Sequence, residues 1–233
     1  MVIFNEWLVF SLALLGIWLV LFVFSKSLRR EMFWVSLLSA PFGLTEPLFV
    51  PEYWNPPSLF NLAAKTGFDI ESLVFSFAIG GIGAILYNSL FKVKHKKMSM
   101  YEMHSKKHRF HLLALFSPVL VFLVVSYFTQ LNPIYSASIA MFFGGIAAML
   151  CRPDLKKEVW MGGVLFFLLY FVYFFFFIKV YPYVVTSFWN LSAISGVLIL
   201  GIPLEELIFA FTYGMLWSSA YEHIRGYKAK KVR

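Results

Sequence analysis

Residues 203–214 read Pro-Leu-Glu-Glu-Leu-Ile-Phe-Ala-Phe-Thr-Tyr-Gly and place two adjacent carboxylates, Glu205 and Glu206, at the start of an otherwise apolar helical segment. Proline suits the first turn of a helix, because its missing N–H is one that no helical partner uses. The two carboxylates then lie among the free amides of that turn, where negative charge is favourable. Charge beside hydrocarbon is nevertheless costly unless it is neutralised, paired or hydrated, so this pair indicates a functional site.

A second stretch of the chain repeats this pattern. Residues 69–80 read Asp-Ile-Glu-Ser-Leu-Val-Phe-Ser-Phe-Ala-Ile-Gly and align with 203–214 without a gap. The identical pairs are Glu71 with Glu205, Leu73 with Leu207, Phe75 with Phe209, Phe77 with Phe211 and Gly80 with Gly214. A further pair of similar motifs, Tyr53-Trp54-Asn55 and Phe188-Trp189-Asn190, precedes the repeated glutamate in each half. We therefore infer an internal duplication.

The composition predicts an all-α polytopic membrane protein. Of 233 residues, 60% are hydrophobic and only 14% are charged. In soluble domains about a quarter of all residues are charged. Apolar windows of about 20 residues predict seven membrane-spanning helices. They cover roughly residues 3–24, 32–50, 70–91, 110–128, 133–151, 159–180 and 203–223.

The basic residues predict how these helices are oriented. All of the 20 Lys and Arg residues except Lys65 and Lys179 lie in four seams on one side of the expected membrane. Such asymmetry is typical of cytoplasmic loops. We therefore expect a multi-pass protein of the cell membrane with its N-terminus outside and its C-terminus in the cytoplasm. The net charge of +8 is then explained by the basic residues of the cytoplasmic loops, which argues against a nucleic-acid partner.

The repeats and the spans together predict the domain organisation. Residues 1–92 form a first three-helix repeat, 93–130 a basic loop with a linker helix, 131–224 a second three-helix repeat and 225–233 a basic tail. One extra crossing between the repeats returns the chain to its starting side. The two repeats therefore share an orientation, as parallel repeats related by an axis along the membrane normal do.

Carboxylates from both repeats are the candidate catalytic groups. Glu46 precedes the outer end of the second span, and Glu71 occupies the position of Glu205 in the first repeat. With Asp69 and Glu206 they are expected to meet in one layer near the outer face. Clustered carboxylates in a low-dielectric place cannot all be ionised, so one can donate a proton while an ionised neighbour accepts one.

Aromatic side chains surround this expected layer and make up 20% of the chain. Lipid-facing and interfacial positions explain most of them, but aromatic faces also stabilise cations. The candidates for lining a substrate site are those in the repeated motifs, namely Phe75, Phe209, Phe211, Trp54 and Trp189.

The Pro-Leu-Glu-Glu of 203–206, the Asp-Ile-Glu-Ser of 69–72 and the doubled three-helix unit resemble the membrane-integral lycopene cyclases, which are built from two related subunits or their fusion. The resemblance implies redox-neutral cyclisation of the end groups of a linear carotene within the membrane, with β-rings as the expected product. It assigns the family's acidic motif to Glu205 and Glu206. The first repeat has Asp69 and Ser72 where the second has Pro203 and Glu206, so the halves are not expected to play equal roles.

The expected partners are a linear carotene substrate and membrane lipid, and a homo-oligomer is compatible with the sequence. No cofactor is expected, because Gly80-Gly81-Ile82-Gly83 lies inside a span and is not a dinucleotide-binding fingerprint. His104, His108 and His111 have helical spacing but lie in a basic flank, so no metal site is expected.

Two functions of other classes also fit the sequence. A transporter with three helices, one linker helix and three helices has the same plan, although the expected spans lack a polar midplane. A carotenoid-binding subunit without activity would keep the fold and lose the chemistry.

The predicted orientation can be tested with reporters. A reporter fused to the C-terminus should be active in the cytoplasm, because nearly all basic residues lie on that side of the expected membrane. Paired fusions with alkaline phosphatase and green fluorescent protein measure this directly. A C-terminal phosphatase that is active, with no fluorescence from the other fusion, contradicts the predicted topology.

Overall fold

The computed structural model describes residues 5–99, 103 and 110–231, and most of them are helical. The α-helices are α1 (Glu6–Phe24), α2 (Arg29–Ser39), α3 (Leu62–Thr66), α4 (Ile70–Leu90), α6 (His111–Phe128), α7 (Pro133–Cys151), α8 (Lys156–Val180), α9 (Val184–Phe188), α10 (Leu204–Trp217) and α11 (Ala220–Arg225). The 3₁₀ helices are η1 (Lys26–Leu28), η2 (Ala40–Leu48), η3 (Leu59–Asn61) and η5 (Pro153–Leu155). The strands are β1 (Val93–Lys97), β2 (Leu198–Ile199), β3 (Ile202–Pro203) and β4 (Tyr227–Lys231).

Five helical segments of the described chain are long and apolar enough to cross a membrane. They are α1, α4, α6, α7 and the segment Pro153–Val180 that contains η5 and α8. Helix α6 shows the reason most clearly, since only 6% of its apolar window is buried inside the protein. A helix of leucine, valine and phenylalanine that is almost uncovered by protein fits a lipid environment. The expectation of a mostly helical, membrane-associated chain is therefore confirmed.

Two of the seven expected spans are not single α-helices. The segment expected at 32–50 consists of α2 followed by the 3₁₀ helix η2, which has Pro41 in its first turn and Pro47 inside it. Proline has no N–H to donate and its ring clashes with the preceding turn, so the α-helical ladder stops. The segment expected at 203–223 consists of α10 and the separate short helix α11. Membrane crossing by these two segments stays a prediction.

The described chain falls into two compact units, and the boundaries cut through helices. Unit 1 comprises residues 1–82, 132–134 and 169–207, and unit 2 comprises residues 83–131, 135–168 and 208–233. Each unit therefore takes segments from both of the expected repeats.

In unit 1 the two repeated aromatic motifs pair with each other. Trp54 and Trp189 form an antiparallel β-bridge outside the named strands. The Asn55 N–H donates to the Phe188 carbonyl at 2.7 Å, and the Asn190 N–H donates to the Tyr53 carbonyl at 2.8 Å. Residues about 135 positions apart are thus tied by reciprocal backbone bonds, which supply partners that a loop would otherwise lack. This pairing holds the segments around residues 53–55 and 188–190 together.

Unit 1 also contains a close backbone approach at Gly43. A Cβ atom at this position would lie 2.5 Å from the Ser72 carbonyl oxygen and 2.6 Å from the Leu73 nitrogen. Only glycine lets η2 come this near to the first turn of α4. The approach carries Glu46, three residues further along η2, towards the acidic start of α4.

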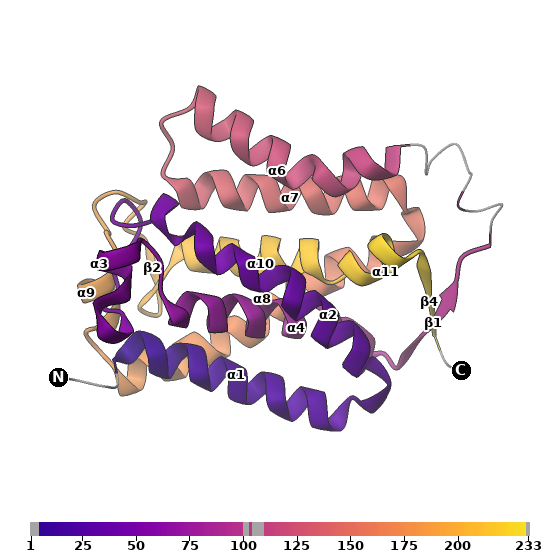
Figure 1. Ribbon diagram of the computed structural model, residues 1–233, viewed down its shortest axis with the longest axis horizontal. Coiled ribbons are helices and arrows are strands. Elements are labelled where there is room, and N and C mark those ends of the chain that lie inside the picture. Colours follow the sequence, from indigo (N-terminus) through magenta and orange to yellow (C-terminus); the bar gives the residue numbers. More distant parts are fainter. Residues whose placement is uncertain (1–4, 100–102, 104–109, 232–233) are drawn as a thin grey trace. The chain divides into compact units, whose positions relative to one another are not determined.

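Unit 2 contains a basic two-stranded sheet and an α-helical hairpin. Strands β1 and β4 pair antiparallel from Val93 opposite Lys231 to Lys97 opposite Tyr227, and Figure 1 shows the two strands side by side. Helices α6 and α7 lie next to each other in Figure 1. A Cβ at Gly144 of α7 would lie 2.5 Å from the Pro118 side chain of α6, so a small residue permits this contact. The unit's core is centred on Leu155, Val159 and Met215, all fully buried.

The approach at Gly43 predicts a measurable difference between two glycines. Gly43→Ala should lower the free energy of unfolding by about 1–3 kcal/mol, because the added methyl group meets backbone atoms that cannot move aside. Gly16 lies inside α1 with no neighbouring atom within 4 Å of its Cβ position. Gly16→Ala should therefore be neutral or stabilise by up to about 1 kcal/mol. Unfolding in detergent micelles with increasing SDS, followed by circular dichroism, measures both; equal midpoints for the two variants would contradict the close approach.

Candidate active site

Unit 1 brings together the five carboxylates that were expected to share one layer. They are Glu46, Asp69, Glu71, Glu205 and Glu206, and none is more than 5% exposed. Glu205 and Glu206 are the second and third residues of α10, and Asp69 and Glu71 flank the start of α4. Helix N-termini point several free N–H groups towards such side chains. The local sequence therefore places the acids at the two helix starts.

Glu206 accepts hydrogen bonds from three neutral donors. One carboxylate oxygen, Oε1, accepts from the Tyr53 hydroxyl at 2.5 Å and from Nε1 of Trp189 at 3.0 Å. The other, Oε2, accepts from the Tyr170 hydroxyl at 2.7 Å. Hydrogen bonds to a charged acceptor are stronger than those between neutral groups. These three donors therefore stabilise the carboxylate form of a side chain that burial would otherwise disfavour.

Tyr53 acts in this arrangement as a neutral donor. Burial raises the pKa of Tyr53 well above the value of 10.0 that tyrosine usually has, and the negative charge of Glu206 raises it further. A phenol beside a carboxylate keeps its proton because two adjacent negative charges in an apolar place would repel each other. The Tyr53 hydroxyl thus stays available to Glu206 at neutral pH.

The repeated glutamates, Glu71 and Glu205, are each tied to a backbone amide of the preceding loop. Oε1 of Glu71 accepts from the Leu59 N–H at 2.6 Å, and Oε1 of Glu205 accepts from the Ser195 N–H at 2.9 Å. Glu71 also accepts from the Asn5 side-chain amide at 2.9 Å. The two positions that align in sequence therefore make the same kind of contact. The start of each helix is therefore joined in the same way to the segment that precedes it.

Glu46 and Asp69 form a pair of adjacent acidic groups. Oδ1 of Asp69 accepts from the Ser72 N–H at 2.6 Å, which is the hydrogen bond of a helix N-cap. Glu46 lies beside Asp69 and Ser72, yet neither of its oxygens makes a hydrogen bond of ordinary geometry with a described residue. Two carboxyl groups buried side by side favour sharing one proton.

Asp69 shows the effect of this burial on titration. Burial raises the pKa of Asp69 above its usual 3.8, and the charge of Glu71 acts in the same direction, while the hydrogen bond from Ser72 opposes both. The folded protein therefore holds this proton more tightly than the unfolded chain does.

A run of aromatic rings lies between the two helix starts in unit 1. Trp7 of α1 contacts Phe75 with ring centroids 5.2 Å apart and contacts Trp54 edge-on at 4.5 Å. Trp54 in turn lies 5.6 Å from Trp189, the donor to Glu206. Electron-rich ring faces of this kind stabilise positive charge in a place without water. Three of the expected substrate-lining residues, Phe75, Trp54 and Trp189, thus belong to one cluster.

The other two expected substrate-lining residues lie in unit 2. Phe209 packs against Tyr213 with ring centroids 5.3 Å apart, and Phe211 packs against Trp160 at 6.2 Å. Both are on the part of α10 that follows its acidic first turn.

Four site residues were not singled out from the sequence as candidates. They are Asn5, Trp7, Tyr53 and Tyr170. Tyr53 stands in a repeated motif, and Tyr170 is one of a few hydroxyl-bearing rings in a phenylalanine-rich helix, so both carried a signal. Asn5 and Trp7 carried none, because their roles depend on where α1 packs.

The five carboxylates are not among the described groups that have the spacing of metal ligands. Of the histidines considered from the sequence, His104 and His108 lie outside the described residues. His111 lies in unit 2, close to Cys151 and His223.

Comparison with known proteins gives one family. The family model described as "Lycopene cyclase" matches residues 5–90 and 132–224, which is more than half of the chain. The two matched regions begin at Asn5 and Asn132, the residues just before the starts of α1 and α7. The comparisons with curated proteins and with solved structures found no match.

The raised pKa of Asp69 predicts a pH-dependent stability. A group that binds its proton more tightly in the folded state loses its favourable contribution as pH rises from its unfolded pKa, here 3.8, through its folded pKa. Asp69→Asn keeps an N-cap oxygen but has no proton to lose. The variant should therefore lose less stability than the wild type between acidic and neutral pH, as measured by SDS unfolding across that range. Glu52→Gln, at an exposed loop carboxylate, is the control, and an Asp69→Asn profile parallel to that of the wild type would refute the assignment.

Proposed function

The chain belongs to the lycopene cyclase family, and from this premise we propose that it cyclises the end groups of lycopene or a related linear carotene within the membrane. The observations that carry the proposal are the buried carboxylates of unit 1, where Tyr170 and Trp189 donate to Glu206 and Glu46 lies beside Asp69, and the aromatic cluster that contains Trp189. Acid, base and a cation-tolerant apolar wall are what this reaction requires.

The proposed reaction is an isomerisation. A carboxylic acid protonates the terminal double bond of the polyene, so that one C–H bond forms and a tertiary carbocation results. A second double bond attacks this cation, which closes a six-membered ring with a new C–C bond and moves the positive charge to a ring carbon. A carboxylate then removes a proton, one C–H bond breaks and a ring double bond forms. Product and substrate have the same atoms and the same oxidation state, and the expected product carries β-rings.

The hydrogen bonds suggest how the acids divide this work. Glu206, with three donors on its two oxygens, is proposed as the proton acceptor, because the donors stabilise its ionised form. The Glu46–Asp69 pair and the neighbouring Glu71 are proposed to supply the proton, since adjacent buried carboxyls retain one. Glu205, which holds the loop amide of Ser195, is proposed to act with Glu206.

The aromatic cluster is proposed to stabilise the intermediate cations. Trp7, Trp54 and Trp189 present three large indole rings in contact. An attractive interaction of about 0.5–2 kcal/mol per ring is typical when a cation approaches an aromatic face, with the larger values in desolvated sites. Such rings offer no nucleophile strong enough to trap the cation, so the charge survives until the proton is lost.

The duplicated architecture is also proposed rather than established. Two regions match the same family model, and the equivalent motifs at Trp54 and Trp189 pair antiparallel. Two equivalent segments that meet on a two-fold axis run antiparallel, so this bridge is compatible with parallel repeats about an axis along the membrane normal. Seven crossings, with the N-terminus outside, complete the proposal.

The function is tested by expression in a lycopene-accumulating bacterium with chromatography of the extracted pigments. Wild-type protein should convert lycopene to a cyclised isomer of the same mass. At least one of Glu205→Gln and Glu206→Gln should lose roughly 10²–10⁴ in turnover, the range typical of general acid–base catalysis, because glutamine keeps the size of the side chain and deletes the titratable group. Glu71→Gln and Glu46→Gln should also lower turnover, and by less, because Asp69 and the other glutamate remain to supply the proton.

The matched control is Glu52→Gln, which deletes an exposed carboxylate one residue before Tyr53 and should leave turnover unchanged. Amounts of inserted protein are compared by immunoblot. If both the Glu205 and Glu206 variants cyclise at the control rate, the proposed acid–base site is wrong. If correctly inserted wild-type protein leaves all lycopene unchanged, the cyclase proposal fails; lycopene that copurifies unchanged would instead identify a carotenoid-binding subunit.

A further inference from the structure

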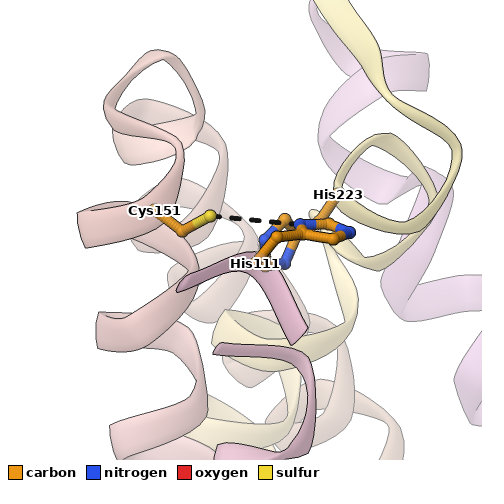
Figure 2. A group of neighbouring side chains, drawn as sticks. All are labelled: His111, Cys151 and His223. Carbon is orange, nitrogen blue, oxygen red and sulfur yellow. Dashed lines mark hydrogen bonds between the residues drawn. The ribbon is translucent and has the colours of Figure 1, made fainter. Parts of the chain in front are cut away.

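Unit 2 gathers one thiol and two imidazoles from three different helices. Cys151 is the last residue of α7, His111 is the first residue of α6, and His223 lies in α11. Figure 2 shows the Cys151 side chain pointing towards the two histidine rings. Cys151 and His223 are 6% and 3% exposed, and His111 is half-buried. A sulfur donor and two nitrogen donors therefore converge at a place that is closed on most sides.

The separations of these donors are close to those of a tetrahedral metal site. Sγ of Cys151 lies 4.0 Å from Nδ1 of His111. One ligand atom from each of the three residues lies within 4.8 Å of the others, and the two imidazole rings meet edge-on with centroids 4.6 Å apart. Zinc–sulfur bonds of about 2.3 Å and zinc–nitrogen bonds of about 2.0–2.1 Å imply ligand atoms about 3.4–3.6 Å apart. Side-chain rotations that bring the three ligand atoms about 1 Å closer together would give the separations of a zinc site.

Hydrogen bonds around the three side chains hold the backbone next to Cys151 and His223 in place. Arg152, the residue after Cys151, donates to the carbonyl of Glu222, the residue before His223, at 3.3 Å and to the carbonyl of Tyr227 at 2.6 Å. The fully buried Glu222 side chain accepts from the Asn88 amide at 2.7 Å. Donor groups fixed in this way lose little freedom when they bind an ion.

The same network of hydrogen bonds offsets the positive charge of Arg152. The Arg152 guanidinium is next to Cys151 in the chain, and its positive charge would oppose a second cation. Asp154 accepts two hydrogen bonds from it, at 2.9 Å and 2.7 Å. A bidentate carboxylate largely neutralises the guanidinium locally, so Arg152 repels a bound cation less.

We propose that Cys151, His111 and His223 bind a divalent zinc-type cation, with water or an exogenous ligand in a fourth position. One thiolate and two neutral imidazoles suit Zn²⁺ and Co²⁺, whereas Mg²⁺ and Ca²⁺ require oxygen ligands. On binding, the thiol proton is released to solvent and the sulfur lone pair forms the bond to the metal, with no change of oxidation state. The ion joins the start of α6, the end of α7 and α11 within unit 2. This site is separate from the five carboxylates and does not depend on the cyclase proposal.

The experiment uses the full-length chain purified in detergent and stripped of metal by a chelator. Titration with Co²⁺ should saturate at one equivalent per chain and produce a thiolate-to-cobalt charge-transfer band together with the visible bands of tetrahedral Co²⁺. Zn²⁺ should displace the cobalt and raise the thermal unfolding midpoint, because a ligand that binds only the folded state stabilises it. Cys151→Ser should abolish the charge-transfer band, and His111→Gln and His223→Gln should each weaken binding at least about tenfold, which corresponds to about 1.4 kcal/mol.

The matched control is His95→Gln, because His95 and Glu222 belong to a second group of described side chains with the spacing of metal ligands. If the ion binds at Cys151, His111 and His223, this variant should bind Co²⁺ as the wild type does. Circular dichroism of the metal-free variants distinguishes lost ligands from lost folding, and the assignment requires folded variants that bind weakly. Saturation without a charge-transfer band, binding that survives in folded Cys151→Ser, or loss of binding in His95→Gln alone would overturn it.

Discussion

The constraint on which unit 1 depends is the cost of burying carboxylates. Five acidic side chains lie almost entirely away from solvent, and an isolated buried carboxylate would lose more hydration energy than a small fold can supply. The chain meets this cost in two ways. Glu206 is surrounded by donors from a loop, from α8 and from the repeated aromatic motif, whereas Glu46 and Asp69 lie side by side, where one proton can serve both. The buried carboxylates therefore differ in their surroundings, with neutral hydrogen-bond donors around Glu206 and a second carboxyl group beside Glu46.

The donors of Glu206 depend on contacts between distant parts of the chain. Tyr53 and Trp189 belong to the two motifs that are joined by reciprocal backbone bonds, one between Asn55 and Phe188 and one between Asn190 and Tyr53. Those bonds hold the two segments together, so the Tyr53 hydroxyl and the Trp189 indole N–H reach the same carboxylate oxygen of Glu206. A close backbone contact also positions Glu46. Because Gly43 has no side chain, η2 can approach α4, and this brings Glu46 beside Asp69. Rigid backbone contacts thus position the acids, and the side chains need little freedom of their own.

Unit 2 shows a different use of polar groups. Its short strands β1 and β4 carry many of the lysines that the sequence predicts to lie on the cytoplasmic side. Its buried Arg152 donates hydrogen bonds to the Asp154 carboxylate and to two backbone carbonyls. Beside this arginine, the end of α7 presents Cys151 to His111 and His223. The two units therefore contain chemically distinct clusters, carboxylates with aromatic rings in one and a thiol with imidazoles in the other.

The sequence by itself determined the helical membrane class, the repeated acidic motif and the family, because hydrophobic windows and short motifs are local properties that the composition of each segment already expresses. It also identified Glu46, Glu71, Glu205 and Glu206 as buried acids, since a charge in an apolar segment is visible without coordinates. Only the tertiary structure decided that η2 interrupts the second expected span, that Asn5, Tyr53 and Tyr170 supply the hydrogen bonds, and that Cys151 meets two histidines. These features depend on which segments pack together, and a side chain's partner across 36, 66 or 153 residues leaves no periodic signal in a single chain.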